Sequence, residues 1–163
     1  MASVYIGLGS NLENPALQIR NAVQAVKSIE STVMSNISSL YYSRPMGPQD
    51  QPDYMNAVAE LSTSLSPIEL LNELQKIENN AGRVRKENQW GPRILDLDIL
   101  LFDNKIITSE RLTVPHYGLQ KREFVLLPLH EIAPKLQLPN GESVEKLSQR
   151  ISSNGLKIHS KLR

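Results

Sequence analysis

The chain has 163 residues, 40% of them hydrophobic and 21% charged, and it contains no cysteine, which excludes disulfides and thiolate metal sites. Its 18 basic residues balance 17 acidic ones, so the net charge of +1 gives no overall field that would attract nucleic acid or a membrane surface. No apolar stretch is long enough to cross a bilayer. These properties predict a single domain over residues 1–163 of a soluble, cytoplasmic protein.

The N-terminal part predicts a strand, a helix and a second strand. Residues 4–8 are a β-branched and aromatic run, and Asn14-Pro15 is a helix start signal followed by apolar residues at helical spacing. Residues 33–43 again have the composition of a strand. The proline-rich stretch 44–54 cannot form a regular element and is expected to be a long, stiffened loop.

The middle of the chain predicts another strand and helix, then an acidic strand. Residues 56–63 have strand composition, and the stretch from Ser66 to Glu69 is a capping box that opens the helix. The basic stretch 83–93 is expected to be an exposed, mobile loop. Residues 94–102 form a nearly continuous apolar run, which is typical of a strand covered on both faces.

The order strand, helix, strand, strand, helix, strand predicts an α+β fold, a ferredoxin-like split βαβ sandwich with a βαββαβ core and extra C-terminal elements. In the last third of the chain, residues 105–107 are expected to form a short hairpin strand. Residues 124–132 are an apolar segment interrupted by Pro128. The basic end, 157–163, is expected to be frayed.

Asp96 and Asp98 interrupt the apolar run, and residues two apart on a strand point to the same face. One explanation is a solvated strand face, because alternation alone would produce it. On a strand covered on both faces, two adjacent carboxylates would instead repel each other and raise one pKa unless a cation lay between them. Magnesium is held by one or two protein carboxylates and keeps its other positions for water and phosphate oxygens. The pair therefore predicts a metal site for a phosphorylated substrate.

Residues that can bind phosphate stand on both sides of the acidic strand. Each basic residue alone is better explained as a solvated surface charge, but their crowding around one acidic strand favours a polyphosphate site. Those before the strand are Arg83, Arg85, Lys86 and Arg93, and those after it are His116, Tyr117 and Arg122.

Four segments resemble the 6-hydroxymethyl-7,8-dihydropterin pyrophosphokinase family. They are GSN at 9–11, GPQDQPDYMNA at 47–57, GRVRKENQWGPRILDLDILLF at 82–102 and RLTVPHYGLQKREFVLLPL at 111–129. The resemblance runs over about residues 3–140, and the block 90–98 is specific, whereas GSN alone carries little weight.

The resemblance implies a transferase of folate biosynthesis, an ATP-dependent diphosphokinase with one pyrophosphokinase domain. Such an enzyme transfers the terminal diphosphate of ATP to the hydroxymethyl group of 6-hydroxymethyl-7,8-dihydropterin and releases AMP. The implied partners are these two small molecules, with no nucleic acid and no membrane, and a monomer is expected. Two Mg²⁺ ions would be held by Asp96 and Asp98.

The resemblance also assigns residues to roles. The catalytic positions are Arg83, Arg93, Asp96 and Asp98. The ATP-binding positions are Leu71, Gln75, Arg83, Arg85, Trp90, Arg93, Ile99, Arg111, Leu112, Thr113, His116, Tyr117 and Arg122. The pterin-binding positions are Ser43, Arg44, Pro45, Met46, Tyr54, Asn56, Trp90, Asp96, Arg122 and Phe124. Arg44 stands where family members often have a second proline, and we expect it to alter loop mobility or pterin affinity.

Several alternatives stay open at the level of the residues. Tyr54 and Phe124 are either walls for a flat heteroaromatic ring or core residues. Either aspartate could take the proton of the acceptor alcohol, and no dedicated histidine base is evident. A nucleotidyltransferase would release inorganic pyrophosphate in place of AMP. An RNA-binding module built on Trp90 and the basic loop would need a basic excess or sheet aromatics, which the sequence lacks.

Overall fold

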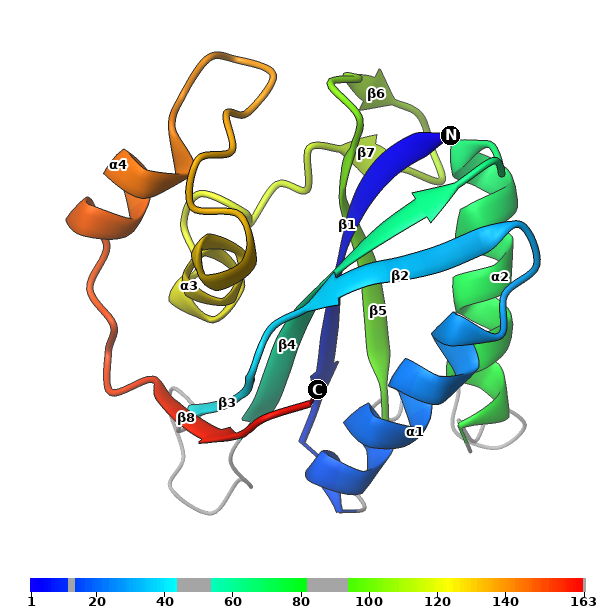
Figure 1. The fold of residues 1–163 in the computed structure, drawn as a ribbon, viewed down its shortest axis with the longest axis horizontal. Helices are drawn as coiled ribbons and strands as arrows, with labels where there is room; N and C mark the ends of the chain where they lie inside the picture. The colour runs from blue at the N-terminus through cyan, green and yellow to red at the C-terminus, as the bar shows by residue number, and fades with distance from the viewer. Residues whose placement is uncertain (12–13, 44–53, 82–93, 163) are drawn as a thin grey trace.

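A computed structural model describes residues 1–11, 14–43, 54–81 and 94–162. Figure 1 shows a twisted sheet with helices on both faces. The elements in chain order are β1 (Ala2–Ser10), α1 (Pro15–Lys27), β2 (Thr32–Ile37), β3 (Leu40–Ser43), β4 (Tyr54–Thr63), α2 (Pro67–Asn80), β5 (Asp96–Phe102), β6 (Ile107–Thr108), β7 (Thr113–Val114), α3 (Glu123–Ile132), α4 (Val144–Arg150) and β8 (Lys157–Ser160). In these residues no helix is both long and apolar enough to span a membrane.

The main sheet confirms the predicted ferredoxin-like core. Its order is β5-β1-β4, with β2 and β3 both pairing with β4 and β8 pairing with β3. The pairs that β1 forms with β4 and β5 are antiparallel, and so are those that β4 forms with β2 and β3. Among the described strands, β5 is therefore the outermost on its side of the sheet and is not central.

The second predicted strand is interrupted, because Ser38 and Ser39 separate β2 from β3. The Ser38 backbone N–H donates to the Val58 carbonyl at 2.9 Å, and the Ser38 hydroxyl accepts from the Val58 N–H at 2.9 Å. The Ser38 hydroxyl thus takes the place of a backbone carbonyl as the acceptor for the Val58 N–H. Serine side chains compete with regular secondary structure in this way. The prediction of one continuous strand over 33–43 was wrong at this point.

Side chains alternate between two apolar layers along β1. Val4, Ile6 and Leu8 are buried in the layer with α1 and α2, whereas Tyr5 is buried in the layer with α3 and α4. This alternation follows from the two-residue period of a strand. The layer with α3 and α4 lies beside only one part of the sheet, as Figure 1 shows. The cavity described below lies next to this layer.

The two helix starts differ. For α2 the predicted capping box is confirmed, because the Ser66 hydroxyl accepts from the Glu69 N–H at 3.2 Å and the Glu69 carboxylate accepts from the Ser66 N–H at 2.8 Å. The bond from the Ser66 backbone lowers the pKa of Glu69. Helix α1 begins at Pro15 as predicted, but Asn14 is left-handed with φ of 60° and its side chain makes no cap bond.

The C-terminal elements correct two predictions. The end of the chain is not frayed through its length, because Lys157–Ser160 forms β8 and pairs with β3. Arg20 of α1 also donates to the Ser160 hydroxyl at 2.8 Å. The hairpin strand expected at 105–107 lies at Ile107–Thr108, where it pairs with β7. The apolar segment 124–132 is helix α3, with Pro128 inside it.

Candidate active site

Asp96 and Asp98 lie at the start of β5 and face a cavity. Across the ladder, Asp96 is opposite Gly9 and Asp98 is opposite Gly7, both in β1. Neither glycine has a side chain that could fill the space beside the carboxylates, and all four residues line the same cavity. The Asp98 side chain is 53% exposed, so the pair opens onto this cavity and is not sealed in the core.

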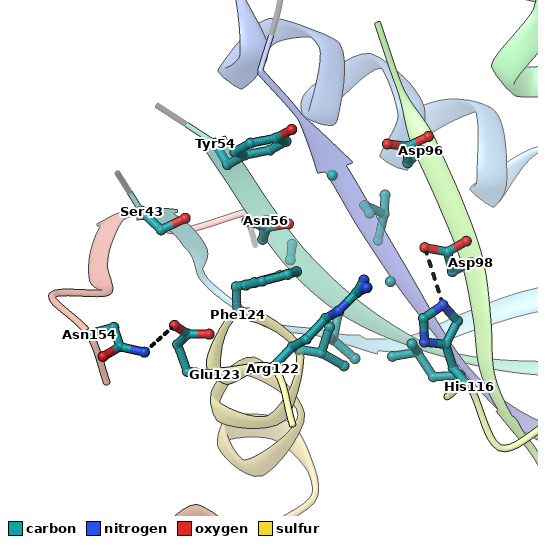
Figure 2. Close-up of a pocket in the computed structure, with 17 residues that line it drawn as sticks. Ser43, Tyr54, Asn56, Asp96, Asp98, His116, Arg122, Glu123, Phe124 and Asn154 are labelled. Carbon is teal, nitrogen blue, oxygen red and sulfur yellow. Dashed lines mark hydrogen bonds and ion pairs between the residues drawn. The ribbon is translucent and has the colours of Figure 1, made fainter. Parts of the chain in front are cut away.

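The cavity lined by the aspartates has a volume of about 500 Å³ and is called the large cavity here. Figure 2 shows its labelled side chains projecting from β3, β4, β5 and the start of α3, and from the segments that contain His116, Arg122 and Asn154. It brings together every described residue of the predicted pterin set, namely Ser43, Tyr54, Asn56, Asp96, Arg122 and Phe124. The side-chain nitrogen of Asn56 is buried and has no hydrogen-bond partner among the described residues, so a ligand that accepts a hydrogen bond would complete it.

A second cavity of about 280 Å³, called the small cavity here, lies on the other side of Asp98. It is lined by Leu71, Gln75, Ile99, Arg111, Leu112, Thr113, His116 and Tyr117, which are the described members of the predicted ATP set apart from Arg122. Arg111 is held in place because its guanidinium donates to Asn72 at 2.6 Å and to Gln75 at 3.0 Å. Arg122 lines the large cavity instead.

Asp98 and His116 line both cavities and form their junction. The His116 backbone N–H donates to the Leu100 carbonyl at 3.0 Å, which docks this segment on β5. Its Nδ1 accepts from the Gly118 N–H at 3.0 Å, so in the neutral ring the proton is on Nε2, 3.9 Å from Asp98 Oδ2. Burial lowers the pKa of His116, while the charge of Asp98 opposes the shift and that of Arg122 adds to it. The neutral ring can donate one hydrogen bond at the junction.

Arg122 is positioned by aromatic rings at the mouth of the large cavity. Its guanidinium lies 5.0 Å from the ring centre of Tyr117 and 5.8 Å from that of Phe124. It also donates to the Tyr117 hydroxyl at 3.2 Å, and the Tyr117 ring stacks on His116 at 4.6 Å. These contacts hold a cation beside the two aspartates, where a phosphate group can bind it.

The donor set suits magnesium. No group of three or more histidine, aspartate or glutamate side chains able to hold a metal occurs in the described part of the chain. A cage made only of protein ligands is therefore not formed by these residues. Two carboxylates that open onto a cavity leave positions for water and phosphate oxygens, which is the usual mode of Mg²⁺ binding.

Several predicted site residues lie outside the described residues. They are Arg44, Pro45, Met46, Arg83, Arg85, Lys86, Trp90 and Arg93. Their expected roles in phosphate and pterin binding stay predictions.

The sequence interpretation missed several residues near the site, among them Gly7, Glu78, Glu123 and Asn154. Gly7 pairs with Asp98, and Glu78 of α2 accepts from the Leu97 N–H at 2.8 Å, between the two aspartates. Glu123 and Asn154 line the large cavity and bond to each other. A signal existed for Glu78, which is four residues after Leu74 on the buried helix face. For Gly7 the signal would require the register of β1 and β5, which the sequence does not contain.

Comparison with known proteins identifies the family. The family model of 7,8-dihydro-6-hydroxymethylpterin-pyrophosphokinase (HPPK) matches residues 5–134. The 2-amino-4-hydroxy-6-hydroxymethyldihydropteridine pyrophosphokinase of Haemophilus influenzae is 52% identical over 154 residues, which cover 94% of this chain and 96% of that protein. The enzyme of the same name from Pseudomonas aeruginosa is 50% identical over 144 residues, covering 88% of each chain.

A solved structure supports the fold independently. Plasmodium falciparum HPPK-DHPS, crystallised with pteroate, has a TM-score of 0.73 and 14% identity to this chain. The match covers 91% of this chain and 42% of the longer Plasmodium chain. With a family model that spans most of the sequence and relatives near half identity over almost its whole length, the chain belongs to the 7,8-dihydro-6-hydroxymethylpterin-pyrophosphokinase family, ATP-dependent transferases of folate biosynthesis.

Proposed function

We propose that the large cavity takes the pterin and the small cavity takes ATP in the reaction of this family. That reaction is the transfer of diphosphate from ATP to the hydroxymethyl group of 6-hydroxymethyl-7,8-dihydropterin, which gives the pterin diphosphate and AMP. The observation that carries the assignment is the junction, because Asp98 and His116 line both cavities. Occupants of the two cavities would meet there with their reacting groups side by side, which supplies the proximity that group transfer requires.

The large cavity suits a flat, polar heteroaromatic ring. Tyr54 and Phe124 supply aromatic surface, and Ser43 and Asn56 supply polar groups near one another. The buried Asn56 nitrogen would donate to a carbonyl or ring nitrogen of the pterin. Such a ligand would remove the cost of leaving this donor unpaired, which favours it over an apolar ring of the same size.

Asp96 and Asp98 would hold two Mg²⁺ ions together with phosphate oxygens of ATP. Bound there, the metal would supply charge neutralisation for the transferred diphosphate and for the oxygen that leaves with AMP. The protein's own part is to fix the two carboxylates two residues apart on one side of β5, against the glycines of β1. Either carboxylate could take the proton of the acceptor alcohol, and the geometry of the described residues favours neither.

The remaining cationic and hydrogen-bonding groups would bind the phosphates. His116 would donate from Nε2, and Arg122 would bind phosphate from the mouth of the large cavity. Arg111 would act in the small cavity. We assign Arg83 and Arg93 to charge stabilisation, and Arg85 and Trp90 to closure over the site, by the family resemblance alone.

We also propose that residues 1–163 act as a single-domain monomer in the cytoplasm. In support of one domain, the two apolar layers of the described residues share one sheet.

Product analysis tests the proposed function. The protein is incubated with ATP, Mg²⁺ and 6-hydroxymethyl-7,8-dihydropterin, and the nucleotides and pterins are separated by chromatography. We expect AMP and pterin diphosphate in equal amounts, formed only when the pterin is present. Release of inorganic pyrophosphate with a nucleotidylated product would indicate nucleotidyl transfer, and AMP formation that does not depend on the pterin would overturn the acceptor assignment.

A further inference from the structure

A tight turn in the C-terminal segment reaches the large cavity. The Leu156 N–H donates to the Ser153 carbonyl at 2.8 Å, and the two residues between them, Asn154 and Gly155, have φ of 49° and 80°. Two consecutive residues in the left-handed region define a type I′ turn, for which Asn-Gly is the favoured sequence. The Asn154 N–H also donates to the Ser152 hydroxyl at 3.2 Å. The turn therefore presents Asn154 in a fixed orientation.

Asn154 connects this turn to α3. Its side-chain amide donates to the Glu123 carboxylate at 2.8 Å, and both residues line the large cavity. Glu123 is the first residue of α3 and directly precedes Phe124. In Figure 2 the Glu123 side chain points toward Asn154 and away from Arg122, so the bond directs the carboxylate to the side of the cavity opposite the aspartates.

The same segment is connected to the other side of the cavity through β8. This strand pairs with β3, with Lys157 opposite Tyr42 and Ser160 opposite Leu40. Strand β3 ends at Ser43, which lines the large cavity. Thus one short segment binds α3 at its turn and β3 at its strand, and it spans the space between these two sides of the cavity.

A second link between α3 and β3 lies at the far end of the helix. The Glu131 carboxylate accepts from the Ser39 N–H at 3.0 Å and from the Tyr41 hydroxyl at 2.7 Å. Glu131 fixes the helix near its C-terminal end, whereas Asn154 acts on its first residue, beside Phe124. The distance between α3 and β3 at the cavity therefore depends more on the Asn154 bond than on the Glu131 bonds.

We propose that Asn154 is a positioning residue for the acceptor. Through Glu123 it sets the position of Phe124 on α3 relative to Ser43 on β3 and to Tyr54, the partner of Ser43 on β4, and so the fit of a planar ring between the two aromatic side chains. The inference rests on the proposed function for the identity of that ring. It assigns a role to the C-terminal segment, which none of the predicted site residues includes.

The test is the binding of 6-hydroxymethyl-7,8-dihydropterin in the presence of Mg²⁺ and a nonhydrolysable ATP analogue, measured by calorimetry. Asn154→Gly removes the amide but keeps a residue that favours positive φ, so the turn is preserved. We expect it to weaken pterin binding by about 3- to 10-fold, the usual range for one net hydrogen bond. Glu123→Ala should have a similar effect, and the double variant should be no weaker than either single one, because both remove the same bond. Glu123→Gln retains an acceptor oxygen and should restore wild-type affinity.

Asn140→Gly is the matched control. Asn140 also donates to a glutamate, Glu142, at 2.6 Å and also precedes a glycine with positive φ, but it does not line either cavity. Pterin affinity should be unchanged in this variant. All variants should keep the wild-type affinity for the ATP analogue and the wild-type kcat, so that the effect appears in the pterin KM alone.

Unchanged pterin affinity in both Asn154→Gly and Glu123→Ala would overturn the inference, and so would an equal loss in Asn140→Gly. A thermal melt of each variant separates this effect from general destabilisation, since an affinity loss that merely follows a fall in Tm would also count against it. Failure of the wild-type protein to transfer diphosphate to the pterin would instead contradict the proposed function, and the two failures are therefore distinguishable.

Discussion

The two cavities that meet at Asp98 differ in how their polar groups are satisfied. In the large cavity the side-chain nitrogen of Asn56 is buried, and none of the residues that the structure describes accepts a hydrogen bond from it. In the small cavity Arg111 already donates to Asn72 and Gln75. A site with an unpaired buried donor rejects ligands that lack the matching acceptor far more strongly than a site whose groups are satisfied without ligand. Under the proposed assignment the large cavity would select the acceptor, and nucleotide affinity would depend more on phosphate charge.

The largest expected effect comes from removing either carboxylate of the proposed metal site. Asp96→Ala or Asp98→Ala should lower the rate of AMP formation by about a thousandfold or more, because the metal that this pair is proposed to hold would contribute several kcal/mol of charge stabilisation. The fold should persist, since the Asp98 side chain is 53% exposed. Turnover and thermal melts measured together check both statements.

Asp103→Ala provides the control for the aspartate variants. This carboxylate follows β5 at its other end, where it accepts from the Ser3 N–H at 2.7 Å, and it lines neither cavity. Its loss should affect stability slightly and leave turnover intact. If Asp96→Ala and Asp98→Ala behaved like Asp103→Ala, the metal role would have to be abandoned.

Asn56→Ala tests whether the two cavities bind different ligands. This variant should weaken pterin binding by about 10- to 100-fold, the range expected when a ligand acceptor loses its buried donor. Binding of the ATP analogue should not change, because Asn56 does not line the small cavity. Arg111→Ala should show the reverse selectivity. If calorimetric titrations showed that each variant loses affinity for the pterin and for the ATP analogue equally, the two cavities would not bind different ligands.

A smaller effect is expected from Gly118→Ala. A Cβ at this position would lie 2.7 Å from Arg122 Nε, so the arginine side chain must shift from its place over Tyr117 and Phe124. A weakening of the proposed charged contact between Arg122 and phosphate predicts a fall of about 10-fold in kcat/KM. Steady-state kinetics of Gly118→Ala beside Arg122→Ala checks this, and wild-type rates in Gly118→Ala would show that the observed stacking is not needed.

The smallest expected effect is the contribution of His116 to the pH dependence of stability. Its pKa is lowered from the ordinary value of 6.5, mainly by burial, so the folded protein binds this proton less readily than the unfolded chain. Its contribution to stability is therefore present above pH 6.5 and is lost as the pH falls from there toward the folded pKa. Denaturant unfolding between pH 7.5 and about 5 should show a steeper loss in wild type than in His116→Asn. Equal slopes would contradict the lowered pKa.

The sequence predicted those parts of the fold that depend on residues close together in the chain. The capping box at Ser66 involves residues three apart, and it forms as expected. The order of strands and helices followed from periodicity, because each element must bury one face. The same reasoning placed Asp96 and Asp98 on one side of a strand, and the structure confirms that they share one cavity.

Long-range pairing explains most of what the sequence missed. Gly7 opposes Asp98 only because of the register between β1 and β5, and β8 exists only because β3 offers it a partner. The polar composition of 157–163 resembles a frayed tail until that pairing is known. Asn154-Gly155 is a turn signal that local reasoning could have found, but its contact with Glu123 depends on how the last third of the chain folds back.

The most direct test of the central assignment is a crystal structure of the protein with 6-hydroxymethyl-7,8-dihydropterin, a nonhydrolysable ATP analogue and Mn²⁺ in place of Mg²⁺. Anomalous scattering would locate the metal. We expect two metal peaks bound to Asp96 and Asp98, with pterin in the large cavity and the nucleotide in the small one. Metal peaks elsewhere, or the two ligands on the same side of Asp98, would contradict the account.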